Sequence, residues 1–236
     1  MQGDCIENQE IISNIKEINK RLCNEIWNVV SSEQTIQGLS PRLILPSIND
    51  VARISEQEAR VLCTSILNST SYYYSIETPT ENSYQFTGNY ALKTRSDLSI
   101  YEIDMGNTFN KIVNVEFKAH NPEASNIKKD IEKLIREDVV GNWFHLFKNM
   151  DSGTFSSVFN KFIQAINDNK QYVNKTISIV FCFCVVEKKI ALQKHFYFTP
   201  NINIDLDEYS RQFFKQNNLD GNSSSNEENG WELIRT

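Results

Sequence analysis

Two carboxylates and one lysine have the types and spacing of a site for a divalent metal ion. Asp97 lies in the segment RSDLSI (residues 95–100), and Glu116 and Lys118 lie in VEFKA (residues 115–119). Residues two apart in a β-strand share a face, and an antiparallel neighbour can bring Asp97 within about 5 to 8 Å of them. Carboxylate oxygens suit Mg²⁺ or Mn²⁺, so we expect Asp97 and Glu116 to be the metal ligands.

Such a group of residues has the components for phosphodiester hydrolysis. A bound Mg²⁺ lowers the pKa of a coordinated water and offsets the charge that builds on the phosphoryl oxygens. Lys118, kept cationic by neighbouring carboxylates, can orient the attacking water and stabilise the transition state.

The elements that must position these residues form a predicted β-hairpin. Apolar and polar side chains alternate over residues 89–104, and Lys93, Arg95 and Asp97 share the polar face. A turn is expected at residues 105–107. Alternation resumes over residues 111–119, where Glu116 and Lys118 lie opposite the apolar side chains.

Helical periodicity predicts elements on either side of this hairpin. Apolar residues recur at three- and four-residue steps over 9–30, 59–67 and 127–135, and a further helix is expected over 155–167. Ser55 and Glu58 form a capping-box pattern, which predicts a helix that begins after Ser55. In the third helix, Lys129, Lys133 and Arg136 are expected to form an outward basic stripe, paired with the acidic residues around them.

The remaining segments complete a one-domain organisation. Residues 176–186 are almost continuously apolar or β-branched, which favours a strand buried on both faces, with residues 191–198 beside it. We expect an N-terminal helix and connection over 1–50, a core over 51–200 with a helical insertion at about 141–170, a C-terminal helix over 201–219, and a disordered tail over 220–236.

The order of a helix, three strands, a helix and further strands, with Asp97 on the second strand and Glu116-Phe117-Lys118 on the third, resembles the PD-(D/E)XK nuclease superfamily. The resemblance covers roughly residues 55–198. It implies an α/β fold: a restriction-endonuclease-like core (αβββαβ), with a mixed central sheet flanked by helices, plus the N-terminal helix. It also implies a magnesium-dependent hydrolase that cuts DNA, of the restriction or defence type. The sequence departs from the family pattern in two ways: no proline precedes Asp97, and residues 143–169 lengthen the link to the next strand.

The resemblance also implies further site residues. A carboxylate on the first core helix often completes the metal shell in this superfamily, and Glu58 is the candidate, with Glu56 competing for the role. Lys93 and Arg95, and on the following helix Lys129 and Lys133, could contact nucleic-acid phosphates, although ordinary solvated faces explain them equally well.

Composition limits the other classes of function. The formal charge of −6 argues against coating nucleic acid by bulk electrostatics, so any nucleic-acid contact must be local. No apolar run reaches the roughly 20 residues of a membrane helix and no signal peptide is recognisable, so we expect a cytoplasmic protein without a membrane partner. The five scattered cysteines are expected to be reduced core residues, and the histidines lack the spacing of a zinc site.

Two alternatives stay open. The chain could be a catalytically inactive PD-(D/E)XK-fold module for nucleic-acid binding or protein assembly. The apolar stripe over residues 11–29 also permits pairing with a partner or a homodimer, although the same stripe would pack equally well on the chain's own core. DNA against RNA, sequence specificity, and endonuclease against exonuclease action cannot be distinguished from these residues.

Overall fold

The protein was analysed as a computed structural model that describes residues 2–31, 43, 47–48, 51–52, 54–85, 90–149, 152–200 and 231–235. The helices are α1 (Gln2–Ser31), α2 (Glu56–Leu67), α3 (Ala124–Arg136), α4 (Ser152–Asn169) and the short 3-10 helix η1 (Lys170–Tyr172). The strands are β1 (Ser47–Ile48), β2 (Val51–Ala52), β3 (Tyr73–Tyr84), β4 (Leu92–Ile103), β5 (Phe109–Ala119), β6 (Val140–Phe147), β7 (Ile177–Val185), β8 (Ile190–Phe198) and β9 (Glu232–Arg235).

A mixed seven-stranded sheet forms the centre of the fold, in the order β3-β4-β5-β6-β7-β8-β9. The pairs β5–β6 and β6–β7 are parallel, and the other neighbours are antiparallel. The helix α3 connects β5 to the parallel strand β6, as a parallel pair requires a crossover. The predicted α/β class with a mixed sheet and an N-terminal helix is therefore confirmed.

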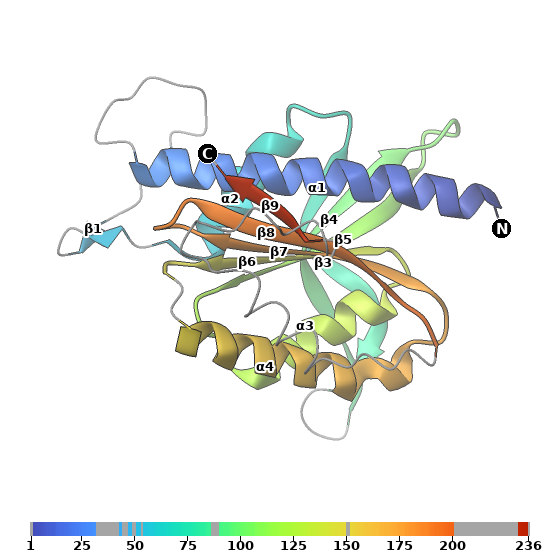
Figure 1. The fold of residues 1–236 in the computed structure, drawn as a ribbon. Coiled ribbons are helices and arrows are strands. Elements are labelled where there is room, and N and C mark those ends of the chain that lie inside the picture. Colours follow the sequence, from blue (N-terminus) through green and yellow to red (C-terminus); the bar gives the residue numbers. More distant parts are fainter. Residues whose placement is uncertain are drawn as a thin grey trace.

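Helices cover both faces of the sheet and give the described part of the chain three layers (Figure 1). Helices α1 and α2 lie on one face, and α3 and α4 lie on the other. Each face has its own apolar core: Ile15, Leu62 and Phe117 belong to the first, and Trp143 and Phe162 to the second. Cys23, Cys63, Cys182 and Cys184 are buried free thiols, as the sequence predicted for them.

The local signals at α2 and at the β4–β5 turn work as the sequence predicts. The backbone N–H of Gln57 donates to Ser55 Oγ at 3.3 Å, and the backbone N–H of Ser55 donates to Glu58 Oε2 at 2.7 Å, which completes the capping box. In the turn, Asp104 Oδ1 accepts from the backbone N–H groups of Gly106 and Thr108 at 2.8 and 2.9 Å. These bonds fix where α2 and β5 begin.

The helix α1 is an integral part of the core and not an addition to it. Ile15, Leu22 and Trp27 are at most 1% exposed, and they pack in the same core as α2 and the sheet. Asn19 and Asn142 exchange two amide hydrogen bonds of 2.9 and 3.0 Å between α1 and β6, so that these polar groups are satisfied inside the core. The apolar stripe is therefore already occupied within the chain.

Two parts of the predicted organisation are wrong. The expected helical insertion at 141–170 begins with the strand β6, and only α4 is helical; every residue of β6 is buried, so the strand shows no alternation that sequence reading could detect. The expected disordered tail contains β9, which pairs with β8. The expected helix over 201–219 lies outside the described residues.

None of the helices in the described part of the chain is both long and apolar enough to cross a membrane.

Candidate active site

The strands β4 and β5 separate at the predicted site. Their pairing runs from Ile103–Phe109 to Leu98–Val115 and ends there. Beyond this point the main chain of β4 no longer pairs with β5. The Asp97 carboxylate instead accepts a hydrogen bond from the backbone N–H of Phe117 at 2.8 Å. The structure thus brings Asp97 beside Glu116 and Lys118 at a fork between two strands.

The carboxylate that α2 contributes comes from Glu56 and not from Glu58. Glu58 is held in the capping box, whereas Glu56 Oε1 accepts the backbone N–H of Ala119 at 3.2 Å, next to Lys118. Glu58 is thus engaged in the capping box, and Glu56 is the acid of α2 that reaches the end of β5; a role for either residue in the metal shell stays a prediction. The capping-box pattern in the sequence could have indicated this difference. It assigns the Glu58 side chain to the start of α2, so that Glu56 is the acid that can face the sheet.

Lys118 lies in a carboxylate environment that also includes Asp130 of α3. Its Nζ is 2.6 Å from Asp130 Oδ2 and donates to the carbonyl of Phe117 at 2.8 Å. Burial alone would lower the pKa of Lys118, but Asp130, Asp97 and Glu56 outweigh it and raise the pKa. Lys118 is therefore cationic at neutral pH, in line with its predicted role.

Lys133 is part of the site, so the predicted outward stripe is wrong at this position. The residue is 5% exposed, and its Nζ lies 2.7 Å from Glu116 Oε2 and 2.6 Å from Asp130 Oδ1. It also donates to the carbonyl of Arg95 at 2.9 Å. Sequence reading missed Asp130 and misplaced Lys133 because charged residues on a helix normally face water.

Glu116 is the most deeply buried carboxylate of the group. It is 0% exposed, its Oε1 has no hydrogen-bond partner, and only Lys133 neutralises it. Burial, followed by Asp130 and Asp97, raises its pKa well above the ordinary value although Lys133 opposes the shift. A carboxylate in this state gains from a cation that supplies more positive charge than one ammonium group.

The other predicted residues lie outside this group. Lys93 and Arg95 are exposed on β4, and Lys129 is half-buried on α3, so their contact with phosphates stays a prediction. His120, which directly follows β5, has a φ of 60°, and its ring nitrogen Nε2 lies 3.0 Å from the Ile54 carbonyl oxygen. It has the structural role of a strand end.

The donor set suits a hard divalent cation in its chemistry. Glu56, Asp97, Glu116 and Asp130 present carboxylates against only two ammonium groups, and Glu116 has an oxygen without a partner. Among the residues that the structure describes, no three carboxylate, histidine or cysteine groups converge as a finished metal site. Asp97 and Glu116 would hold the ion once the Lys133 ammonium no longer neutralises Glu116.

His145 stabilises the strand next to the site. It is fully buried on β6, its Nε2 donates to the carbonyl of His120 at 2.8 Å, and its ring stacks on Phe147 at 4.2 Å. Burial lowers its pKa to about 3, so the ring is neutral at physiological pH.

This burial predicts a loss of stability in mild acid. The unfolded chain takes up a proton on His145 near its ordinary pKa of about 6.5, whereas the folded chain does not until the pH approaches 3. The contribution of neutral His145 to the free energy of unfolding is therefore complete above about pH 6.5. It is lost as the pH falls, by about 2 kcal/mol between pH 7 and pH 5. Urea unfolding of wild type and His145→Gln at these two pH values measures it. Phe147→Leu should be less stable than wild type at both pH values but show the same change in unfolding free energy between them. If His145→Gln also showed the wild-type change, His145 would not be the source of the pH dependence.

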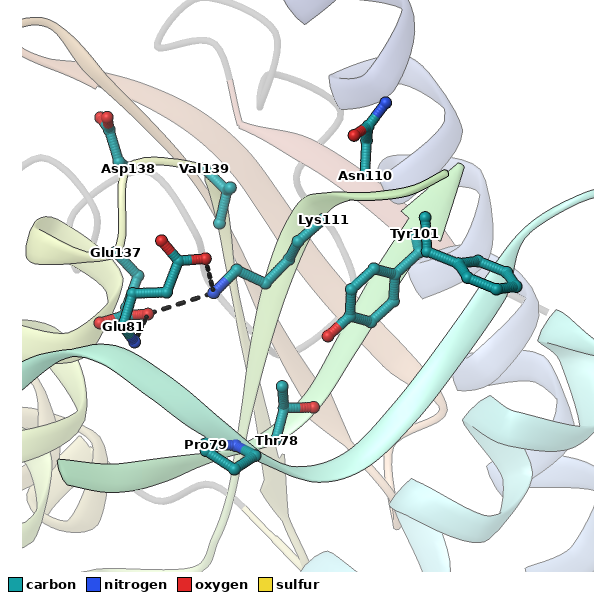
Figure 2. Close-up of a pocket in the computed structure, with 10 residues that line it drawn as sticks. Thr78, Pro79, Glu81, Tyr101, Asn110, Lys111, Glu137, Asp138 and Val139 are labelled. Atoms are coloured by element: carbon teal, nitrogen blue, oxygen red, sulfur yellow. Dashed lines mark hydrogen bonds and ion pairs between the residues drawn. The ribbon is translucent and has the colours of Figure 1, made fainter. Parts of the chain in front are cut away.

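A separate pocket of about 450 Å³ lies at the start of β5. It is lined by Thr78, Pro79, Glu81, Tyr101, Phe109, Asn110, Lys111, Glu137, Asp138 and Val139. Figure 2 shows Lys111 between Glu81 and Glu137, with its Nζ 3.2 Å from a carboxylate oxygen of each. None of the predicted site residues lines this pocket, so it is distinct from the strand fork.

Comparison of the chain with protein-family models, with curated proteins and with solved structures finds no match.

Proposed function

We propose that the protein is a metal-dependent nuclease that hydrolyses phosphodiester bonds, with DNA as its substrate. The observation that carries the proposal is the fork between β4 and β5, where Asp97, Glu116 and Lys118 meet with Glu56. The chain order α2, β3, β4, β5, α3, β6 is also the αβββαβ order of the PD-(D/E)XK resemblance. Site residues and element order thus support the same proposal independently.

Each residue of the fork has a definite task in this proposal. Asp97 and Glu116 would hold Mg²⁺ or Mn²⁺, which supplies an activated water and offsets phosphoryl charge. Lys118 is held by Asp130 and remains protonated, so its ammonium can orient the water and stabilise the developing negative charge. Glu56 fixes the end of β5 through the amide of Ala119.

DNA would enter along the exposed part of β4. Lys93 and Arg95 are exposed there, on the strand that carries Asp97, and can contact phosphates that flank the scissile one. With a formal charge of −6, the protein needs such local contacts, because its overall field repels nucleic acid.

One observation favours a second candidate, a catalytically inactive module of the same fold that binds nucleic acid or assembles with proteins. Glu116 is fully buried and paired with Lys133, so the site is closed by an ion pair. In this candidate the pair is permanent and stabilises the fold. Calorimetric titration with Mn²⁺ discriminates between the two, since an inactive module without a metal site shows no binding that depends on Asp97.

The test is a cleavage assay on plasmid DNA, linear DNA and RNA, each with Mg²⁺, Mn²⁺ or EDTA. We expect wild type to cut DNA with either metal and not with EDTA. Asp97→Asn should lose cutting, whereas Asp168→Asn, which changes a half-buried acid paired with Lys128, should retain it. Equal cutting by wild type and Asp97→Asn would identify a contaminant and sink the proposal.

A further inference from the structure

The ammonium of Lys133 occupies a position that is built like a cation site. Three oxygen atoms surround its Nζ: Asp130 Oδ1 at 2.6 Å, Glu116 Oε2 at 2.7 Å and the carbonyl oxygen of Arg95 at 2.9 Å. They come from three elements, α3, β5 and β4, and both acidic residues are buried, Glu116 completely. The oxygens therefore converge because of the tertiary fold and not because of local sequence.

A divalent ion can take this position in place of the ammonium group. Mg²⁺ binds oxygen at about 2.0–2.1 Å, so the three oxygens would move inward by less than about 1 Å. Glu116 Oε1 has no partner and can add a further ligand. Without Lys133, four carboxylates would face only Lys118, an excess of negative charge that a doubly charged ion offsets more fully than one lysine.

We propose that the divalent ion assigned above to Asp97 and Glu116 is also bound by Asp130 and the Arg95 carbonyl, and that it enters by displacing the Lys133 ammonium. The inference rests on the proposed function for the identity of the ion and adds two features to it. Asp130, on α3, becomes a metal ligand. Lys133 competes with the metal for the same oxygens, and its ammonium group occupies the site while no metal is bound.

The first experiment locates the metal in the wild-type chain. Mn²⁺ is added to ¹⁵N-labelled protein, and the broadening of backbone amide signals is recorded as the concentration rises. We expect the amides of Arg95, Glu116 and Asp130 to broaden first, and those of Leu233 and Ile234 on the edge strand β9 to be affected least. Broadening that is absent, or that is centred away from α3, would overturn the site.

The second experiment measures the competition by calorimetric titration with Mn²⁺. Lys133→Met should bind at least about tenfold more tightly than wild type, and Asp130→Asn at least about tenfold more weakly. Lys128→Met, which removes a charge from the exposed side of the same helix, should bind as wild type does. If Lys133→Met binds no more tightly, or Asp130→Asn no more weakly, lysine displacement is excluded. If Lys133→Met does not fold, the amide broadening in wild type and the Mn²⁺ affinity of Asp130→Asn still test whether the metal binds at this site.

These readouts are separate from catalysis. A chain that binds Mn²⁺ at Glu116 and Asp130 but cuts no nucleic acid would retain this inference and lose the nuclease. A chain that cuts DNA while Asp130→Asn leaves Mn²⁺ affinity unchanged would retain the nuclease and lose this inference.

Discussion

Replacing Lys118 with methionine should reduce metal-dependent DNA cleavage by about 10² to 10³-fold and leave the protein folded. Loss of one preorganised group that stabilises transition-state charge costs about that factor. Lys118 is held cationic and oriented by Asp130, so its ammonium is such a group. Asp130 keeps its pairing with Lys133 in the variant, which protects the local fold. Single-turnover cleavage rates measure the effect.

The control for this variant separates catalysis from binding. Lys128→Met removes an equal charge from an exposed ion pair with Asp168 and should cut at the wild-type rate. Mn²⁺ affinity, measured by calorimetry, should be retained in Lys118→Met, since methionine removes no ligand. A loss of cleavage smaller than tenfold would show that the ammonium takes no part in the reaction.

Glu137→Ala should lower the free energy of unfolding by about 3–5 kcal/mol. The Glu137 carboxylate, 1% exposed, accepts hydrogen bonds from the backbone N–H groups of Glu81 and Asn82 and from the Tyr84 hydroxyl at 2.8–3.0 Å. Lys111 Nζ lies 3.2 Å away and is itself nearly buried (Figure 2). Alanine would leave a buried ammonium and several donors without this acceptor. Urea unfolding of wild type and variant measures the loss.

Glu123 supplies the matched control for this substitution. It lies at the other end of α3, is exposed, and makes no capping bond through its side chain. Glu123→Ala should change the unfolding free energy by no more than about 0.5 kcal/mol. If Glu137→Ala changed the unfolding free energy as little as Glu123→Ala, the bonds of the Glu137 carboxylate would not be what anchors β3 to the end of α3.

The hairpin and its three site residues could be predicted because their signals are local. Alternation with period two fixes which side chains share a face, and Asp97, Glu116 and Lys118 follow it. The capping box of α2 likewise depends on residues four positions apart at most. Both partners of the capping box lie within a few residues of each other, and a short turn joins the two strands of the hairpin.

The strand β6 and the site residues of α3 could not be predicted in this way. Residues 140–147 are buried on both faces, so burial removes the alternation that marks a strand. Asp130 and Lys133 read as surface charges, and they are buried only because β5 presents Glu116 and Lys118 to α3 across the core. The environment of Glu137 could not be predicted for the same reason, since its donors come from β3 and β5. Contacts between distant segments decide these positions.

The central claim is that the strand fork hydrolyses DNA with a metal ion, and one measurement tests it most directly. Wild type, Glu116→Gln and Glu123→Gln are purified in parallel, and the cleavage of an end-labelled DNA duplex is followed in Mn²⁺. We expect wild type and Glu123→Gln to cut at the same rate and Glu116→Gln to fall to background while it remains folded. Cutting by Glu116→Gln at the wild-type rate, or no cutting by the wild-type chain, would contradict the claim.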